Sequence, residues 1–309
     1  MGADALFKRL AIIGIGLIGS SVARAARQFG QAERIVCADL SPENRAEALR
    51  LGVVDEAFAD PADAVRGADL VLLSIPLGAY GAVGQAMAPG LTAGTLITDV
   101  GSCKQSVLRD LAPHLPPGVS FIPGHPVAGT EHSGPAAGFA ELFRGRWCIL
   151  TPTDEAPADK LESLRAFWAA FGSKVEMMDA RHHDMVLAIT SHVPHLIAYN
   201  IVGTADDLQA VTQSEVIKYS AGGFRDFTRI AASDPTMWRD VFLNNKEAVL
   251  EMLQRFTEDL TALQRAIRWD DGDTLFKLFS RTRTIRRAII DAGQETAAAD
   301  FGRDKADKA

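Results

Sequence analysis

The chain has 309 residues, which is enough for two domains of ordinary size. Hydrophobic residues make up 47% and charged residues 23%, the balance of a soluble globular protein. The net charge of −7 at pH 7 argues against a nucleic-acid-binding role, because such proteins present basic faces.

The first predicted element is a buried strand that leads into a glycine-rich turn. The apolar run Leu10–Ile13 predicts the strand, and Gly14, Gly16 and Gly19 follow with the spacing G-x-G-x-x-G. This spacing is typical of a dinucleotide-binding turn, in which the helix predicted over Leu17–Phe29 directs free N–H groups at the pyrophosphate. The residues predicted to contact the cofactor are these three glycines together with Leu17 and Ile18.

A carboxylate follows the second predicted strand, Arg34–Leu40, at the distance that this fingerprint requires. Asp39 lies 20 residues beyond Gly19, where a carboxylate accepts hydrogen bonds from the ribose hydroxyls of an adenine nucleotide. Arg45, in the helix that follows, could instead bind the 2′-phosphate of NADP. We predict NAD, because Asp39 would repel that phosphate. The alternative is a tight strand–helix turn with an acidic residue there by chance.

Two further predicted strands end in polar residues. Asp69–Pro76 predicts a strand that ends at Ser74 and Pro76, and open α/β sheets bind ligands at the carboxyl ends of their strands. Gly94–Val100 predicts the next strand, and Ser102 follows it. With a glutamine three residues later, Ser102 matches a capping box. A helix cap is therefore the alternative to a role in the site, and the two roles are compatible.

A histidine lies in a rigid context after the next short strand. The segment Ser120–Glu131 contains His125 between glycine and proline, at the predicted carboxyl end of a strand beside the cofactor. This is a favourable place for a general base that titrates near pH 6.5. The alternative is a structural histidine.

The α/β pattern ends before residue 181. Gly145–Thr151 and Lys174–Met178 predict two more strands, with a helix between them near Ala158–Phe171. Only helical periodicity follows. We therefore predict an α/β fold with a Rossmann dinucleotide-binding domain over residues 1–180, an all-α domain over 181–290 and a frayed tail over 291–309.

The helix predicted near His183–Val202 carries two histidines around a proline. Pro194 lacks an N–H group and should kink the helix, while His192 and His195 share one face. Two ligands without a nearby acidic partner make a poor metal site, so we predict no metal and a polar ligand pocket. These polar residues also interrupt the apolar stretch Met185–Gly203, which favours a buried helix over a membrane span.

Two arginines follow in an apolar context. Arg225 and Arg229 are four residues apart, as expected for one helical face that binds a dianionic substrate. The alternative is a solvated charged face. Asp234 should cap the next helix, and apolar residues at helical spacing continue from Trp238.

The motifs GIGLIGSS, DVGSCK, GHPVAGTEHSG and SHVPH, in this order, resemble the prephenate/arogenate (cyclohexadienyl) dehydrogenase family of tyrosine biosynthesis. The resemblance extends from about Arg9 to Ile290. It implies NAD-dependent oxidative decarboxylation of prephenate, arogenate or both. It also implies a homodimer formed through the long helices, a small-molecule substrate and a cytoplasmic location, without a nucleic-acid or membrane partner.

The resemblance also assigns roles to residues. His125 would accept the proton of the ring hydroxyl, and Ser102 would hydrogen-bond the same oxygen. Arg229 would bind a substrate carboxylate. The remaining substrate-binding candidates are His195 and Ser191, which would contact the substrate, and Glu131 and Arg225, which would order the pocket.

Two other functions stay open at this point. A two-domain dehydrogenase of the β-hydroxyacid type is expected to use a catalytic lysine in its helical domain, which SHVPH and FRDFTR do not match. A non-catalytic nucleotide sensor would leave the presence of His125, His195 and Arg229 unexplained.

Finally, Cys37 and the other two cysteines lack metal-binding spacing, which favours reduced thiols in the cytosol.

Overall fold

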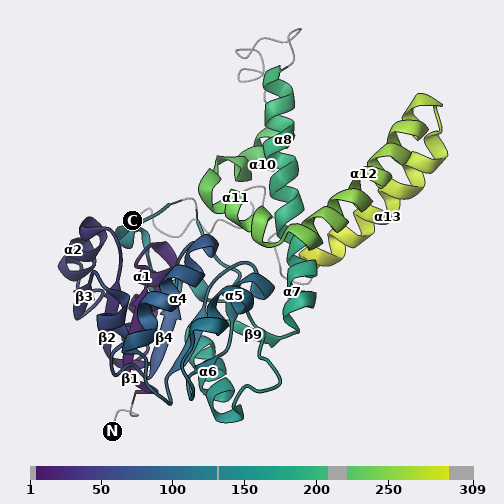
Figure 1. The fold of residues 1–309 in the computed structure, drawn as a ribbon. Helices are drawn as coiled ribbons and strands as arrows, with labels where there is room; N and C mark the ends of the chain where they lie inside the picture. Colours follow the sequence, from purple (N-terminus) through teal and green to yellow (C-terminus); the bar gives the residue numbers. More distant parts are fainter. Residues whose placement is uncertain (1–4, 131, 208–220, 292–309) are drawn as a thin grey trace. The chain divides into compact units, whose positions relative to one another are not determined.

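The computed structural model describes residues 5–130, 132–207 and 221–291 (Figure 1). Glu131 and the predicted tail beyond residue 291 lie outside these ranges. The chain divides into two compact units, Met1–Met252 and Leu253–Ala309. The first unit contains both sheets and all of the candidate site residues that the structure describes.

The main sheet has six parallel strands in the order β3-β2-β1-β4-β5-β6. This is the order of a Rossmann fold, in which the direction of strand addition reverses beside the first strand. The strands, in sheet order, are β3 (Glu56–Phe58), β2 (Ala32–Ala38), β1 (Phe7–Ile13), β4 (Leu70–Leu73), β5 (Leu96–Asp99) and β6 (Ser120–Phe121). The predicted fold class is thus confirmed.

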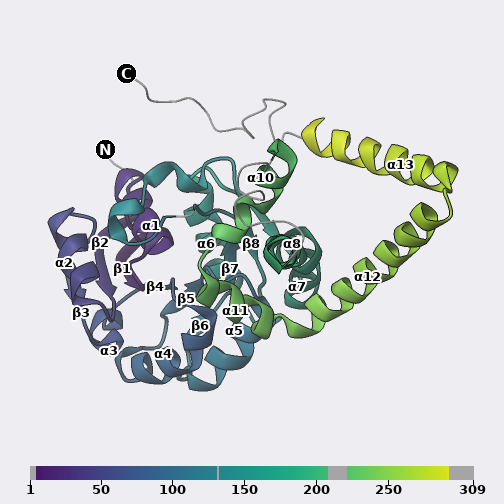
Figure 2. The same ribbon diagram turned by 90° about the horizontal axis from the view of Figure 1, so that it is seen from above.

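Helices cover both faces of this sheet. Figure 2 shows α1 on one side and α3 and α4 on the other. The helices of this part are α1 (Leu17–Gln28), α2 (Pro42–Arg50), α3 (Pro61–Val65), α4 (Tyr80–Met87), α5 (Lys104–Leu111) and α6 (Ala158–Ala170). Short 3-10 turns are η1 (Leu77–Ala79), η2 (Ala88–Gly90), η3 (Ala112–His114), η4 (Pro135–Ala137) and η5 (Ala140–Phe143).

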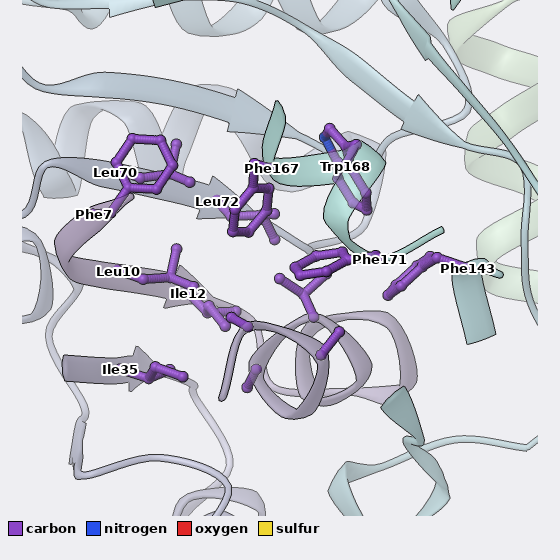
Figure 3. Packing of buried hydrophobic residues seen from close by; sticks show 14 of the residues in the cluster. Phe7, Leu10, Ile12, Ile35, Leu70, Leu72, Phe143, Phe167, Trp168 and Phe171 are labelled. Atoms are coloured by element: carbon purple, nitrogen blue, oxygen red, sulfur yellow. The ribbon is translucent and has the colours of Figure 1, made fainter. Parts of the chain in front are cut away.

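From Leu10 to Ile13, strand β1 is apolar because both of its faces are buried. Leu10 and Ile12 pack on the side of α1 and α6, while Ala11 and Ile13 pack on the side of α3, α4 and α5. The first side carries aromatic rings from α6, Phe167 and Trp168, which belong to the same buried cluster as Leu10 and Ile12 (Figure 3). This packing fixes the end of β1 from which the glycine-rich turn starts.

A second sheet of three strands follows, in the order β7-β8-β9. Its strands are β7 (Gly124–Pro126), β8 (Trp147–Leu150) and β9 (Lys174–Met177). Strand β7 pairs antiparallel with β8, so that His125 lies opposite Ile149. The prediction that His125 sits at the carboxyl end of a strand is therefore wrong in detail. The histidine lies within a separate short strand whose ladder fixes its backbone.

The helical part begins after β9. Its elements in the first unit are α7 (Ala180–Leu187), a π turn (Ala188–His192), α8 (Val193–Asp207), α10 (Gly222–Thr228), the 3-10 turn η7 (Arg229–Ala232), α11 (Pro235–Asn244) and the start of α12 (Lys246–Arg268). The predicted interruption at Pro194 takes the form of the π turn. A wider turn leaves room for a residue that cannot donate a backbone hydrogen bond, and π turns concentrate at functional sites.

The second unit contains the rest of α12 and α13 (Gly272–Asp291). Its helices expose large apolar side chains, including Trp269 (68%) and Phe276 (73%).

In the first unit, the helical stretch Ala180–Asp207 is by length and composition apolar enough to cross a membrane, yet only 28% of its most apolar window is buried. Exposed apolar side chains on it include Ile189 and Ile201.

Candidate active site

A cavity of about 300 Å³ opens at the end of β1, where the sequence predicts the dinucleotide site. The predicted residues Gly14, Gly16, Asp39, Ser74 and Pro76 all line it. It lies where strand order reverses, which is the usual ligand position in a doubly wound sheet. The cavity therefore fits the adenosine end of a dinucleotide.

The glycine-rich turn has the geometry that phosphate binding needs. Gly14 has φ +90°, and a Cβ there would overlap the carbonyl oxygen of Ser74. A Cβ at Gly19 would overlap the carbonyl oxygen of Gly14, so the helix can pack this close only without a side chain. A Cβ at Gly16 would meet nothing within 4 Å, which leaves open space for a phosphate beside the N-terminus of α1. Leu17 and Ile18 form the first turn of that helix.

Asp39 joins this turn to the start of α2. Its Oδ2 accepts the amide N–H of Ile15 at 2.9 Å, and its Oδ1 accepts the amide N–H of Ser41 at 2.9 Å. Arg45 donates from Nη1 to the carbonyl oxygens of Asp39 and Leu40 at 2.6 and 3.1 Å, so its guanidinium is bound to the backbone. The carboxylate is held at the cavity wall, where a ribose would lie.

The capping interpretation of Ser102 is wrong. The N-cap of α5 is Cys103, without a side-chain cap, and Ser102 lies half-buried on the turn before it. Asp184 of α7 caps α5 instead, because its Oδ1 and Oδ2 accept the amide N–H groups of Lys104 and Gln105 at 2.7 and 2.9 Å. The predicted role of Ser102 in the site therefore stands apart from helix capping and stays a prediction.

His125 is the first member of a buried hydrogen-bonded chain. Its Nδ1 lies 2.8 Å from Nε2 of His183, and Nδ1 of His183 lies 2.9 Å from Oδ1 of Asp184. His125 is 8% exposed and the other two are almost completely buried. Among the described residues, the only side-chain hydrogen bond of His125 is through Nδ1, which leaves Nε2 for a ligand.

The protonation states of this chain follow from its surroundings. Burial, together with His183, Lys104 and His192, lowers the pKa of His125 well below 6.5. Burial also lowers the pKa of His183, although Asp184 opposes this. Burial by itself would raise the pKa of Asp184, but hydrogen bonds from His183 and two backbone amides outweigh it and keep that pKa low. At neutral pH both histidines are therefore neutral and Asp184 is ionised.

A buried ion pair supports the strand that carries His125. Lys104 Nζ lies 2.6 Å from Asp99 Oδ2 and donates to the carbonyl oxygen of Gly124 at 2.6 Å. Asp99 also accepts from the amide N–H of Gly124 at 3.0 Å and the hydroxyl of Tyr80 at 2.8 Å. Lys104 and Asp99 must be present together, since either one alone would be an uncompensated buried charge. Their hydrogen bonds to the main chain of Gly124 fix the start of β7.

A second group of rings lies around the π turn. The ring of His195 stacks on Trp238, with centroids 3.6 Å apart, and its Nδ1 lies 2.9 Å from the carbonyl oxygen of Ser191. Burial is the main cause that lowers the pKa of His195, and the charge of Arg229 contributes. Ser191 thus contacts His195 through its main chain, and the exposed Arg229 lies near enough to influence the pKa of His195, while the substrate-binding role of all three stays a prediction.

His192 connects the two groups. It is completely buried, it helps to lower the pKa of His125, and His195 in turn helps to lower the pKa of His192. Its Nδ1 lies 3.0 Å from the amide nitrogen of Asn245, a donor, so its Nε2 carries the proton and has no partner within the described ranges. Burial lowers its pKa to about 4. His192 is therefore a neutral donor beside the site.

Two predicted site residues are not brought into this group. The side chain of Arg225 is 74% exposed and lies 3.7 Å from Asp226. Helix α10 ends at Thr228, so Arg229 opens a 3-10 turn and does not continue one regular α-helix with Arg225. Glu131 lies outside the described residues.

Four residues of these buried networks were not predicted from the sequence: His183, Asp184, Asp99 and Lys104. A signal was present, since a histidine and an aspartate at the start of a largely apolar helix need partners when they are buried. Asp99 and Lys104 flank Ser102 within the motif DVGSCK and received no role. Within the described ranges, no cluster of three or more His, Cys, Asp or Glu side chains could hold a metal ion, and all three cysteines are free and buried.

Comparisons with known proteins identify relatives along almost the whole chain. Residues 22–177 match the family described as prephenate dehydrogenase, nucleotide-binding domain, and residues 179–281 match prephenate dehydrogenase, dimerization domain. The cyclohexadienyl dehydrogenase of Zymomonas mobilis is 45% identical over 286 residues, which cover 92% of this chain and 97% of that protein. The prephenate dehydrogenase of Bacillus subtilis is 33% identical over 279 residues, covering 90% and 75%.

A solved structure is similar over the same extent. It is the crystal structure of prephenate dehydrogenase from A. aeolicus in complex with hydroxyphenyl propionate and NAD+. The TM-score is 0.85 at 34% sequence identity, and the match covers 91% of this chain and 98% of that one.

Proposed function

Because this chain belongs to the prephenate dehydrogenase family, we propose that it catalyses the NAD-dependent oxidative decarboxylation of prephenate, arogenate or both in tyrosine biosynthesis. Relatives bear the names of these activities, and the A. aeolicus structure holds NAD+ with a hydroxyphenyl compound. In this chain, the glycine-rich turn and Asp39 hold NAD. When bound, NAD accepts the hydride from the ring carbon that carries the hydroxyl.

His125 acts as the general base. Its unprotonated Nε2 takes the proton of the hydroxyl on the substrate ring. The β7–β8 ladder holds the backbone of His125 in place. Ser102, on the turn after β5, hydrogen-bonds the same oxygen and orients it. Since formation of an aromatic ring supplies much of the driving force, these residues chiefly position the substrate and hold its proton.

Arg229 binds a substrate carboxylate from the helical part, and His195 and Ser191 contact the substrate beside it. Arg225 and Glu131 stay as proposed residues that order the pocket.

The observation that carries this function is the hydrogen bond between His125 Nδ1 and His183 Nε2, which leaves the other nitrogen of a neutral, buried imidazole as the base. The test is steady-state formation of NADH with prephenate and with arogenate. We expect turnover with at least one of them, and the two kcat/KM values reveal the preference. No turnover with either substrate, in a folded protein that binds NAD, would refute the proposal.

We further propose that the enzyme prefers NAD to NADP, since Asp39 lies at the cavity wall and Arg45 is bound to backbone oxygens. Replacing Asp39 by alanine removes the carboxylate that would repel a 2′-phosphate. The ratio of kcat/KM with NAD to that with NADP should therefore fall. A higher kcat/KM with NADP in the unmodified enzyme contradicts this proposal.

We propose that the chain forms a homodimer through its helical part, because the helices of this part expose many large apolar side chains. The exposed apolar face of Ala180–Asp207 is better explained by a second copy than by a membrane, since the π turn and the exposed polar side chains of Thr190 and Asn200 interrupt it. Light scattering at micromolar concentration should give twice the chain mass of 33.2 kDa. A monomer would contradict this assembly.

The boundary near residue 180 between a nucleotide-binding and a helical domain also stays a proposal, supported by the end of the last strand at Met177. A cytoplasmic location is proposed on the three free cysteines.

A further inference from the structure

We propose that His183 and Asp184 form a positioning relay that holds His125 in the one tautomer that can act as the base. The proposal rests on the proposed function, because it concerns the same proton. Neither residue is in reach of the substrate, since both are buried behind His125. They act through hydrogen bonds.

The proton positions follow from Asp184. Its ionised carboxylate can only accept, and it already accepts the amide N–H groups of Lys104 and Gln105. Nδ1 of His183, 2.9 Å from Oδ1, must therefore carry a proton and donate. A neutral imidazole protonated at Nδ1 is unprotonated at Nε2, so Nε2 of His183 is an acceptor.

The same logic sets the state of His125. Its Nδ1, 2.8 Å from the accepting Nε2 of His183, must carry the proton. Its Nε2 is then the unprotonated, basic nitrogen, which is the atom that lacks a partner among the described residues. In free histidine nothing selects between the tautomers to this degree, and the wrong one would present an N–H group to the substrate hydroxyl.

The charges around the relay favour this arrangement. His125 faces His183 and Asp184 from α7, Lys104 from α5 and His192 from the π turn. Lys104 is paired with Asp99, and His192 is neutral. When His125 takes a proton, Asp184 is therefore the unpaired negative charge in the cluster. Through His183 it stabilises the imidazolium.

The proton that His125 accepts from the substrate is later returned to the product, so the relay needs no contact with solvent. The O–H bond of the substrate breaks and its proton goes to Nε2 of His125. Loss of hydride and of carbon dioxide leaves the ring aromatic, with its oxygen as a phenolate. The phenolate then takes the proton back from Nε2, so the phenolic product keeps it. No proton has to reach solvent, and a chain that ends at a buried carboxylate is sufficient.

The test compares two variants of His183. In His183→Phe the ring keeps its approximate shape but offers His125 no acceptor. In His183→Gln the ionised Asp184 attracts the amide N–H group, so the amide oxygen faces His125 and accepts from Nδ1. We expect kcat to fall by about 10²-fold or more in His183→Phe, with KM within about threefold. We expect kcat of His183→Gln to be at least about tenfold higher than that of His183→Phe.

A nitrogen-15 NMR spectrum of the imidazole rings gives a readout independent of turnover. In the unmodified protein at neutral pH, the signals lost in His125→Asn should show protonation at Nδ1 and not at Nε2. Protonation at Nε2 would overturn the proposal, as would an unchanged kcat in a folded His183→Phe protein. Equal losses in both His183 variants would also overturn it. If neither prephenate nor arogenate is turned over, the proposed function fails, whereas the NMR result still decides the tautomer.

Discussion

Replacing His125 by asparagine is expected to lower kcat by about 10²–10⁴-fold, the usual range for loss of a general base. Asparagine keeps a polar side chain of similar size but has no basic nitrogen. Because the proposed substrate-binding residues Arg229 and His195 are unchanged in this variant, KM should change much less. The measurement is steady-state kinetics at saturating NAD, with circular dichroism as the control for folding.

The pH profile gives the same variant a second test. In the proposed mechanism the neutral form of His125 is the active one, so kcat/KM should rise with pH through the pKa of His125 in the free enzyme. The pKa near 6.5 expected from the sequence is too high, because burial and three neighbouring cationic or imidazole groups lower it. The acidic limb should therefore lie below pH 6.5 and should vanish in His125→Asn. If the limb persists in the folded variant, the base lies elsewhere, and His195 is the next candidate.

Replacing Arg229 by alanine is expected to raise the KM for the substrate strongly while the affinity for NAD stays nearly the same. Loss of one charge-assisted contact with a carboxylate costs about 1.5–3 kcal/mol, or roughly 10- to 150-fold in affinity. Arg229 opens the 3-10 turn after α10, and its charge helps to lower the pKa of His195. Substrate kinetics and a separate NAD titration measure the two effects.

Arg225→Ala is the matched control for Arg229→Ala. Arg225 lies four residues earlier, but its side chain is 74% exposed and its nearest charged partner is Asp226. Its removal should raise KM less than the removal of Arg229. An equal weakening of NAD and substrate binding in Arg229→Ala would instead show that this arginine has a structural role.

The parts of the fold that could be predicted depend on local rules. Gly14 requires a positive φ and Gly19 a close approach, and both requirements are visible in the spacing of the glycines. Asp234 caps α11 as predicted, because its Oδ1 accepts an amide only three residues away. The apolar run of β1 predicted a strand that is buried on both faces.

The parts that could not be predicted depend on contacts between distant residues. The cap of α5 comes from Asp184, about 80 residues away, so the local match of Ser102 to a capping box was misleading. His125 belongs to a second sheet because it pairs with β8, which local sequence does not reveal. His183 becomes part of the site only when α7 packs against α5 and β7.

The most direct test of the central claim is the stoichiometry of products from the purified enzyme. Prephenate and arogenate are each supplied with NAD, and NADH and carbon dioxide are measured together. With at least one substrate, the account predicts one carbon dioxide for each NADH, and both products should decrease in parallel in His125→Asn. NADH without carbon dioxide, or neither product from either substrate in a folded, NAD-binding protein, would contradict it.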